Sequence, residues 1–143
     1  MSRPVQNDGR VHGVVVAIQR DDGKWLLIRR SAHLAAAPGK VCFPGEAVEK
    51  DEDYRAAVAR ESREELGVEV EPMAPCWRYD FPDKPLTLFG WTARLLDQQT
   101  IKADPGEVAE ILWLSGDEAV NHPDAIATNR DFLACLDRHL ATQ

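Results

Sequence analysis

Hydrophobic residues near the start of the chain fall into two short runs separated by a polar turn. The run from Val11 to Gln19 is rich in valine and is typical of a strand buried on both faces. The turn at residues 20–23 contains Asp21, Asp22 and Gly23 and leads to a second strand over residues 24–29. Two strands joined by so short a turn are expected to pair as a hairpin.

Further along the chain, the sequence predicts a helix. Asp51 or Asp53 can cap a helix that ends at Leu66, and Gly67 stands where a left-handed C-cap residue belongs. The pattern also predicts strands at 41–43, 68–70, 77–81, 86–95 and 109–114, and helices at 116–120 and from 128 or 129 to 140. This order of elements predicts an α/β fold, with a mixed sheet and helices on its faces.

Composition narrows the class of protein. The 143 residues suit a single domain over residues 1–143. No apolar run is long enough for a membrane span, and residues 1–10 are polar, lack a secretory pattern and are expected to be loose, so we expect a cytoplasmic protein. A net charge of −7 argues against a nucleic-acid polymer as partner but allows a small phosphorylated ligand. The cysteines Cys42, Cys76 and Cys135 form no CxxC pair and are interpreted as packing residues.

Acidic residues gather on one part of the predicted helix. At 100° per residue, Glu61, Glu64 and Glu65 fall within about one third of the helix circumference. Helical spacing places Arg60 and Arg63 on the other side. The neighbouring arc, expected to face the core, holds Val58, Ala59 and Leu66. The three carboxylates therefore lie beside the buried edge of the helix.

Carboxylates in this arrangement repel one another, which leaves two interpretations. In the first, a hard divalent cation offsets the repulsion, since Mg²⁺ prefers carboxylates together with phosphate oxygens and water. In the second, the cluster is a solvated acidic face on which Arg60 pairs with Glu64 at i+4. The helix by itself does not decide between them.

The residues around the helix resemble the Nudix box, the signature of the Nudix hydrolase superfamily. Glu52 stands at the first glutamate of that pattern, and after seven further residues the chain continues Arg-Glu-Ser-Arg-Glu-Glu-Leu-Gly-Val over positions 60–68. Phe43-Pro44-Gly45 matches the common lead-in, so the box covers about residues 45–68. Two positions depart from the pattern: Glu46 replaces a glycine and Ser62 replaces an aliphatic residue. The glycine change is expected to alter a turn whose backbone carbonyl helps to hold the metal in the family.

The resemblance implies a fold, a reaction and a set of site residues. The fold would be an α/β/α sandwich with a mixed sheet, and the reaction would be hydrolysis of a pyrophosphate bond with Mg²⁺ or Mn²⁺. Arg60 would pair with Glu52 and hold the box loop against the helix. The metal ligands carried over by position are Glu61, Glu64 and Glu65, with a backbone carbonyl from Gly45 or Glu46.

Other residues are candidates for proton transfer and substrate binding. Glu61 is the first choice as general base, and Glu107 and Glu110 are the alternatives. Arg29, Arg30 and Lys40 flank the box and suit phosphate oxygens. Because Arg29 and Arg30 are successive strand residues, at most one of them is expected to face the site.

Several substrates and activities fit the resemblance. The expected substrate is a nucleoside diphosphate linked to another group, such as a nucleoside triphosphate, a nucleotide sugar or a dinucleotide. Residues 29–45 partly resemble the segment that precedes the box in coenzyme A pyrophosphatases, although Ala37 and Lys40 depart from it. An isopentenyl diphosphate isomerase would use a cysteine such as Cys42, and Glu46 is the feature that favours a non-catalytic nucleotide sensor. The resemblance also favours a homodimer.

Overall fold

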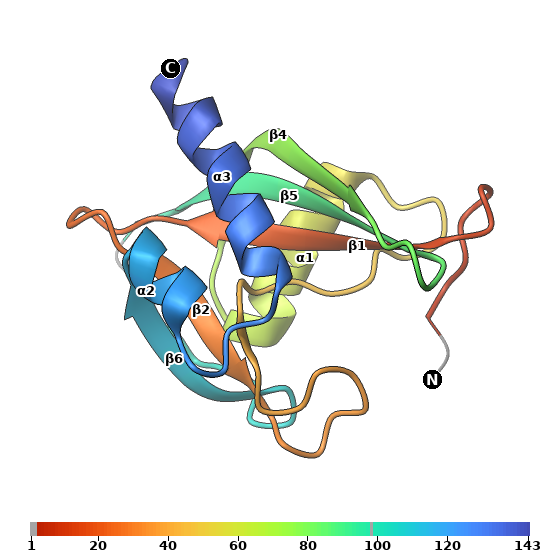
Figure 1. Ribbon diagram of the computed structural model, residues 1–143, viewed down its shortest axis with the longest axis horizontal. Coiled ribbons are helices and arrows are strands. Elements are labelled where there is room, and N and C mark those ends of the chain that lie inside the picture. The colour runs from red at the N-terminus through yellow and green to blue at the C-terminus, as the bar shows by residue number, and fades with distance from the viewer. Residues whose placement is uncertain (1–2, 98) are drawn as a thin grey trace.

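The strands in the described part of the chain form two three-stranded sheets (Figure 1). The computed structural model describes residues 3–97 and 99–143. Within them, the strands are β1 (Val11–Ile18), β2 (Trp25–Arg30), β3 (Val41–Cys42), β4 (Val70–Asp80), β5 (Leu86–Leu95) and β6 (Val108–Leu114), and the helices are α1 (Tyr54–Leu66), α2 (Gly116–Asn121) and α3 (Thr128–Ala141).

The first sheet is mixed, as the order of elements predicts. Its strand order is β1-β5-β4, with β1 parallel to β5 and β4 antiparallel to β5. The second sheet has the order β3-β2-β6 and is antiparallel. The α/β class predicted from the sequence is therefore confirmed.

The predicted hairpin between the first two strands is wrong. β1 and β2 share one isolated bridge, between Gln19 and Trp25, and then diverge into different sheets. Both strands are buried on both faces, as their apolar runs predict, so each needs neighbours above and below. The pairing partners within each sheet come from distant segments: β1 pairs with β5, and β2 pairs with β6.

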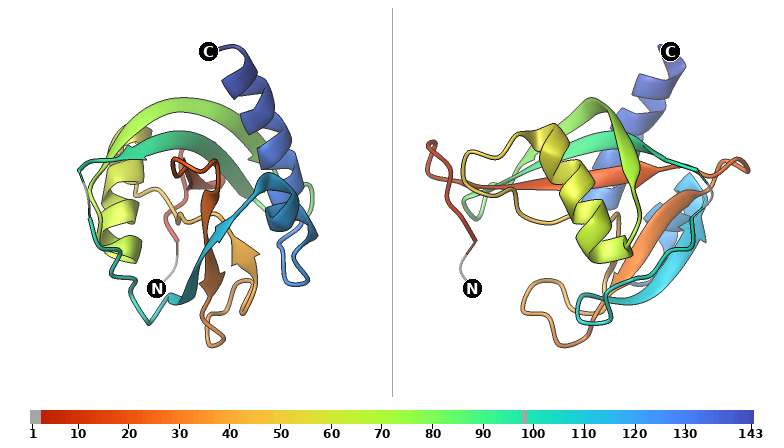
Figure 2. Two further views of the ribbon diagram at one scale, coloured as in Figure 1. Left: turned by 90° about the vertical axis from the view of Figure 1, so that its left-hand side faces the viewer. Right: turned by 180° about the vertical axis from the view of Figure 1, so that it is seen from behind.

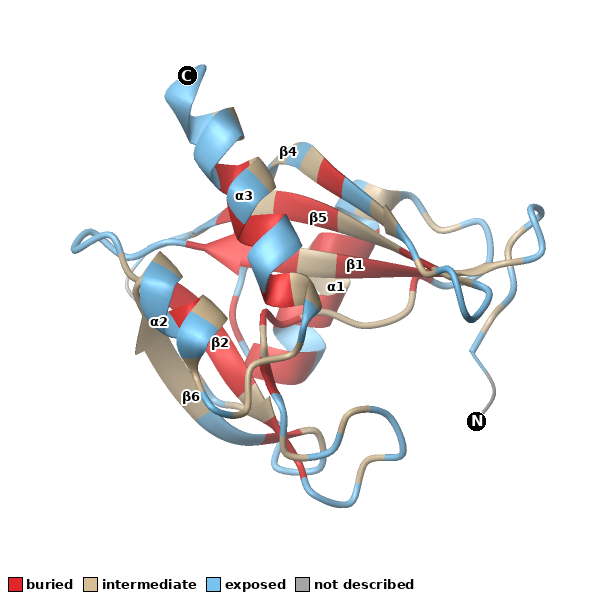
Figure 3. Cartoon of the chain, viewed as in Figure 1, coloured by how far each residue is buried: buried red, intermediate tan, exposed pale blue. Residues whose placement is uncertain are grey.

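Helices α1 and α3 cover opposite faces of the mixed sheet. Figure 1 shows α3 in front of this sheet, and the rear view in Figure 2 shows α1 on its other side. The side chains of β1 alternate accordingly: Val14, Val16 and Ile18 pack into the core beneath α1, whereas Ala17 packs into the core beneath α3. Figure 3 shows that buried residues occupy much of β1 and β5 and part of α3.

Close packing between β5 and α3 depends on a glycine. A Cβ atom at Gly90 would lie 2.4 Å from the ring of Phe132, which is buried in the core beneath α3. Gly90 therefore allows α3 to lie directly against the sheet. No helix within residues 3–97 and 99–143 is long and apolar enough to cross a membrane.

The ends of α1 form as the sequence predicts. The side chain of Asp53 accepts a hydrogen bond from the backbone N–H of Arg55, and Gly67 adopts a left-handed conformation with φ 63°. At α2, Ser115 and Glu118 form a reciprocal capping box. These local signals fix where the acidic helix begins and ends.

Strand β4 is longer than predicted. The sequence pattern indicates separate extended segments at 68–70 and 77–81, interrupted by Pro72 and Pro75, but β4 runs continuously from Val70 to Asp80. β4 is an edge strand of its sheet, and its pairing with β5 shifts register at both prolines. An edge position tolerates proline because the missing N–H need not bond to a neighbouring strand.

Candidate active site

The loop before α1 is fixed to the helix through Gly45. This residue has φ 144°, and a Cβ atom there would lie 1.9 Å from the carbonyl oxygen of Val14. The backbone N–H of Gly45 donates to Oε1 of Glu65 at 2.9 Å. Glycine is therefore required at this position, since only it allows the loop to pass so close to β1.

Glu65 is a buried carboxylate with one unsatisfied oxygen. Its relative exposure is 1%, and its Oε2 has no hydrogen-bond partner in the described part of the chain. Burial raises the pKa of Glu65 well above its usual value, and the negative charges of Glu46, Glu107 and Glu61 act in the same direction. An unpaired buried carboxylate oxygen is costly, which points to a cationic partner.

Glu61 is the second buried carboxylate of α1. It is 5% exposed and accepts a hydrogen bond from Nη1 of Arg60 at 2.8 Å. Burial raises its pKa to about 7, even though Arg60 opposes this shift. Glu64 differs, because its side chain is 58% exposed and it accepts from the same Nη1 at 3.0 Å.

Arg60 connects the loop to the acidic helix. Its guanidinium donates to both carboxylate oxygens of Glu52, at 2.8 and 2.9 Å, and to the carbonyl of Ala47 at 3.2 Å. This hydrogen bonding lowers the pKa of Glu52. Helical spacing predicts that Arg60 points away from the carboxylates, and this prediction is wrong. The long side chain of Arg60 turns back and pairs with Glu52, Glu61 and Glu64.

The donor set fits a hard divalent cation. Glu61, Glu64 and Glu65 all belong to the same turns of α1, and Glu65 Oε2 is unpartnered. Within residues 3–97 and 99–143, however, no three acidic, histidine or cysteine side chains converge closely enough to hold a metal ion as they stand. Oxygens of Glu61 and Glu64 face Arg60, so a cation here would compete with that guanidinium.

Glu107 and Glu110 lie in different surroundings. Glu107 precedes β6 and lines a cavity of about 380 Å³ with Arg30 and Glu46. Burial raises its pKa, and the charge of Glu46 adds to the effect. Glu110 is half exposed and pairs with Arg29 at 3.0 Å. The structure thus places Glu107, and not Glu110, beside the buried carboxylates.

Of the three basic residues, only Arg30 faces the cavities. It is 9% exposed, its Nε donates to the Ala36 carbonyl at 2.9 Å, and its Nη1 donates to Glu46 at 3.1 Å. Arg29 points to the other face and pairs with Asp124 at 2.8 Å. Lys40 is exposed on that same side. The hydrogen bond from Arg29 lowers the pKa of Asp124, and the positive charge of Lys40 acts in the same direction.

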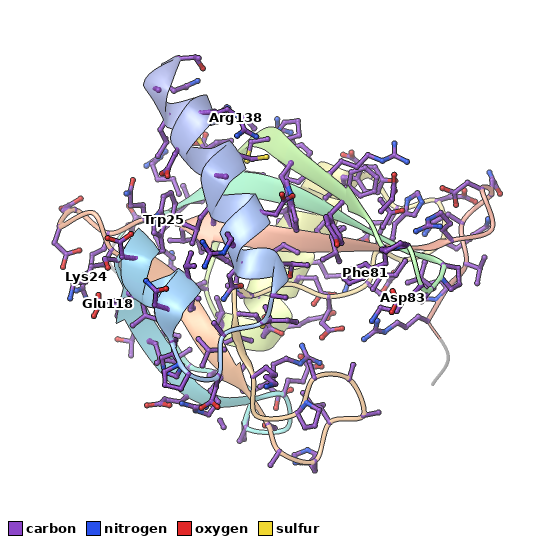
Figure 4. All side chains as sticks on the ribbon, viewed as in Figure 1. Lys24, Trp25, Phe81, Asp83, Glu118 and Arg138 are labelled. Atoms are coloured by element: carbon purple, nitrogen blue, oxygen red, sulfur yellow. The ribbon has the colours of Figure 1, made fainter. Side chains whose placement is uncertain are left out.

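A larger cavity of about 390 Å³ adjoins these groups between the mixed sheet and α3. Its lining is mainly apolar and aromatic, and it includes Trp77, Phe81 and Phe132 together with Arg30 and Glu46. Phe81 lies beside the turn that joins β4 to β5 (Figure 4). A cavity of this size and character suits a nucleoside-sized group, with its charged end at the arginine.

Cys42 also lines this cavity, but its thiol is not reactive. Burial raises the pKa of Cys42 to about 12, although nearby Arg30 opposes the shift. A thiol with this pKa stays protonated at neutral pH and is a poor nucleophile. This agrees with the interpretation of Cys42 as a packing residue.

Two residues of the site were not singled out from the sequence. Arg3 lines both cavities, and its position in a polar terminal segment gives no signal of this. Asn129 lines the larger cavity and is 3% exposed. The sequence predicts that α3 starts at Thr128 or Asn129, and it starts at Thr128; the Asn129 amide donates to the carbonyls of Val41 and Ala119.

Comparisons with known proteins agree with this arrangement. The model of the NUDIX domain matches residues 9–136. The 8-oxo-dGTP diphosphatase of Escherichia coli K12 is 29% identical over 109 residues, which cover 73% of this chain and 84% of that protein. The CTP pyrophosphohydrolase of the same organism is 36% identical over 116 residues, which cover 80% of this chain and 83% of that protein.

The fold is also shared with a solved structure. The crystal structure of the MutT protein from Methanosarcina mazei Go1 superposes with a TM-score of 0.79 at 25% identity, over 97% of both chains. Other curated relatives are matched over a smaller share of their length, between 38% and 61%.

Proposed function

The chain belongs to the Nudix family of hydrolases, and from that premise we propose that it is a magnesium-dependent pyrophosphohydrolase of nucleoside triphosphates. The observation that carries the proposal is the unpartnered Oε2 of buried Glu65, whose other carboxylate oxygen accepts from Gly45, a residue that lines the larger cavity together with Arg30. That combination suits a cation, a phosphate chain and a nucleoside in adjacent positions.

The residues that would hold the metal are Glu61, Glu64 and Glu65, with the carbonyl of Gly45. Bound Mg²⁺ or Mn²⁺ would acidify water and neutralise charge on the phosphate oxygens. Arg60 would keep the loop and helix together while it releases Glu61 and Glu64. Its bidentate pairing with Glu52 is independent of those two carboxylates and provides that anchor.

Two glutamates are our candidates to accept the proton of the attacking water. Water adds to a phosphorus atom, the bond from that phosphorus to the bridging oxygen breaks, and one proton is released. Glu61 is the first choice, because it is a buried carboxylate at the proposed metal site. Glu107 lines the adjoining cavity and is the alternative. We exclude Glu110, Arg29 and Lys40 from the proposed site, because they face the opposite side of β2.

A nucleoside triphosphate is the substrate class with the best support. Two relatives that this chain matches over most of their length are named as 8-oxo-dGTP diphosphatase and CTP pyrophosphohydrolase. The aromatic cavity can hold one nucleoside. Coenzyme A, nucleotide sugars and dinucleotides remain alternatives for the same site, since they carry the same pyrophosphate bond. An isomerase that depends on Cys42 is disfavoured by the protonated state of its thiol.

The test is a substrate panel with Mg²⁺ or Mn²⁺. It would contain CTP, 8-oxo-dGTP, the common nucleoside triphosphates, UDP-glucose, ADP-ribose, diadenosine tetraphosphate and coenzyme A. We expect a nucleoside monophosphate and pyrophosphate from at least one triphosphate. Tight nucleotide binding without turnover would instead identify a sensor. Light scattering on the same sample would test the proposed homodimer.

Variants tie the activity to the proposed site. Glu64→Gln and Glu65→Gln should each abolish turnover, because each removes one anionic metal ligand. Glu69→Gln is the matched control, since Glu69 follows α1, is exposed and pairs with Arg63 away from the cavities. Normal turnover in either α1 variant would exclude that residue as a metal ligand.

A further inference from the structure

The segment before β1 is bound along the loop that precedes α1. We call residues 3–10 the N-terminal arm. The side-chain amide of Gln6 donates to the carbonyls of Val48 and Glu49, at 3.4 and 3.2 Å, and its oxygen accepts from the backbone N–H of Asp51 at 3.4 Å. Figures 1 and 2 show the arm beside this loop. The expectation that this segment is loose is therefore wrong for residues 3–10, and residues 1 and 2 lie outside the described residues.

Two further contacts fix the arm. Nζ of Lys50 donates to the side chain of Asn7 at 2.7 Å. Asp8 contacts Nε2 of His12 at 2.8 Å, and Nδ1 of the same ring lies 2.5 Å from the hydroxyl of Tyr54, the first residue of α1. The arm is thus connected both to the loop and to the helix that carry the acidic residues.

The start of the arm brings Arg3 to the active site. Its guanidinium lies 3.7 Å from Oε2 of Glu46, and Oε1 of the same carboxylate accepts from Arg30 at 3.1 Å. One carboxylate therefore lies between two arginines. Arg3 lines the larger cavity and also the one that Glu107 borders, so it lies where the two adjoin.

We propose that Arg3 is a phosphate-binding residue of the active site, which the N-terminal arm positions opposite Arg30. The proposal rests on the proposed function, because it assigns a residue to the phosphate chain of that substrate. Glu46 bridges the two guanidiniums through its two oxygens, in the way that a phosphate group can bridge two arginines.

The charge of the site supports this role. Glu61 and Glu65 are buried on α1, and Glu46 and Glu107 line the adjoining cavity, so four carboxylates share this part of the molecule. A triphosphate is repelled by these groups unless cations balance them, and Arg30 is already paired with Glu46. Arg3 supplies a second positive charge at the same place.

Arg3 and Arg30 differ in how far their side chains are exposed to solvent. The side chain of Arg3 is 42% exposed and that of Arg30 is 10% exposed. Arg30 is held by the carbonyl of Ala36 and the carboxylate of Glu46, so its position is fixed. The single contact of Arg3 with Glu46 at 3.7 Å is weak in solvent, and a polyphosphate carries more charge than one carboxylate. Arg3 is therefore free to turn from Glu46 to a bound phosphate.

The experiment compares Arg3→Ala and Arg3→Lys with the unchanged chain. Steady-state hydrolysis of CTP and 8-oxo-dGTP with Mg²⁺ gives KM and kcat, and calorimetric titration with magnesium tripolyphosphate measures binding without a base. For Arg3→Ala we expect KM and the tripolyphosphate dissociation constant to rise about tenfold, as for a lost charged hydrogen bond, with a smaller change in kcat. Arg3→Lys should restore part of the affinity.

Two controls separate this role from a structural one. Arg94→Ala removes an exposed arginine whose partner is Glu71; neither residue lines either cavity, so this change should leave KM unchanged. Gln6→Ala loosens the arm but removes no charge, so it should also raise KM. The double variant with Arg3→Ala should be no worse than Arg3→Ala alone, because both changes act through the same guanidinium.

The outcomes distinguish this inference from the proposed function. If the unchanged chain hydrolyses a nucleoside triphosphate, and Arg3→Ala matches Arg94→Ala in KM and tripolyphosphate affinity, the role of Arg3 is refuted and the enzyme assignment stands. If the unchanged chain neither hydrolyses any triphosphate nor binds tripolyphosphate, both proposals fail. A selective rise in KM that lysine partly reverses supports the inference.

Discussion

Replacing Glu61 by glutamine should change how the stability of the protein depends on pH. Burial raises the pKa of Glu61 from an ordinary value of 4.5 to about 7 in the folded state. Between these two values the folded state binds a proton that the unfolded state has lost. The free energy of unfolding is therefore highest at low pH and falls as the pH rises through 7, because the folded state must then ionise a buried carboxyl.

The size of this effect follows from the two pKa values. Linkage gives a loss of roughly 2.5 kcal/mol between pH 5 and pH 8 for Glu61 alone. Glu61→Gln cannot ionise and should lack this part of the decline. Glu65, whose pKa burial also raises, remains in the variant, so some dependence on pH should persist.

The assay is urea unfolding at pH 5 and pH 8, with EDTA and then with excess Mg²⁺. With EDTA, the unchanged chain should lose about 2.5 kcal/mol more than Glu61→Gln between the two pH values. Mg²⁺ should remove the decline in the unchanged chain, since a cation binds the ionised carboxylate and stabilises the folded state. Equal pH dependence in both proteins would refute the claim that Glu61 is buried and uncharged at low pH.

Further changes test the packing and the ion pairs of the site. Gly45→Ala should destabilise the fold by more than about 3 kcal/mol, because the new Cβ would overlap the Val14 carbonyl. Glu46→Gly is the control and should fold normally, and thermal unfolding measures the stability of both variants. Gly90→Ala should cost about 2 kcal/mol or more through the clash with Phe132, and Phe132→Leu in the same chain should recover part of the loss in urea unfolding. Arg60→Ala should cost about 3 kcal/mol, because it leaves Glu52 and Glu61 unpaired, and Mg²⁺ should recover more of that stability than NaCl does.

Local features of the fold could be predicted from the sequence because their causes are local. The caps of α1 at Asp53 and Gly67 depend on neighbouring backbone groups, and the burial of β1 on both faces follows from its valines. Strand pairing could not be predicted in the same way. β1 pairs with β5, some seventy residues later, and no local pattern distinguishes that partner from β2.

The site shows the same division. The spacing of Glu61, Glu64 and Glu65 places them on one part of α1 whatever the rest of the fold. The choice between Arg29 and Arg30, and between Glu107 and Glu110, depends on which face of β2 and β6 meets the cavities. Alternation along a strand says that neighbours point apart but not which one points inward. Arg3 depends on a long-range docking of the arm, which polar composition does not reveal.

The glycine requirement in the loop falls on Gly45 and not on the position of Glu46. Gly45 has φ 144° and touches β1, whereas Glu46 is not among the described residues with positive φ. The glutamate therefore costs no backbone strain, and the carbonyl of Glu46 still accepts from the N–H of Val14 at 3.0 Å. The backbone of this turn is compatible with glutamate, and the expectation that the substitution alters the turn stays a prediction. The substitution also changes the charge of the site. The carboxylate of Glu46 faces Arg30 and adds to the effect of burial in raising the pKa of Glu65 and Glu107. Arg3 lies at the same carboxylate and offsets its negative charge.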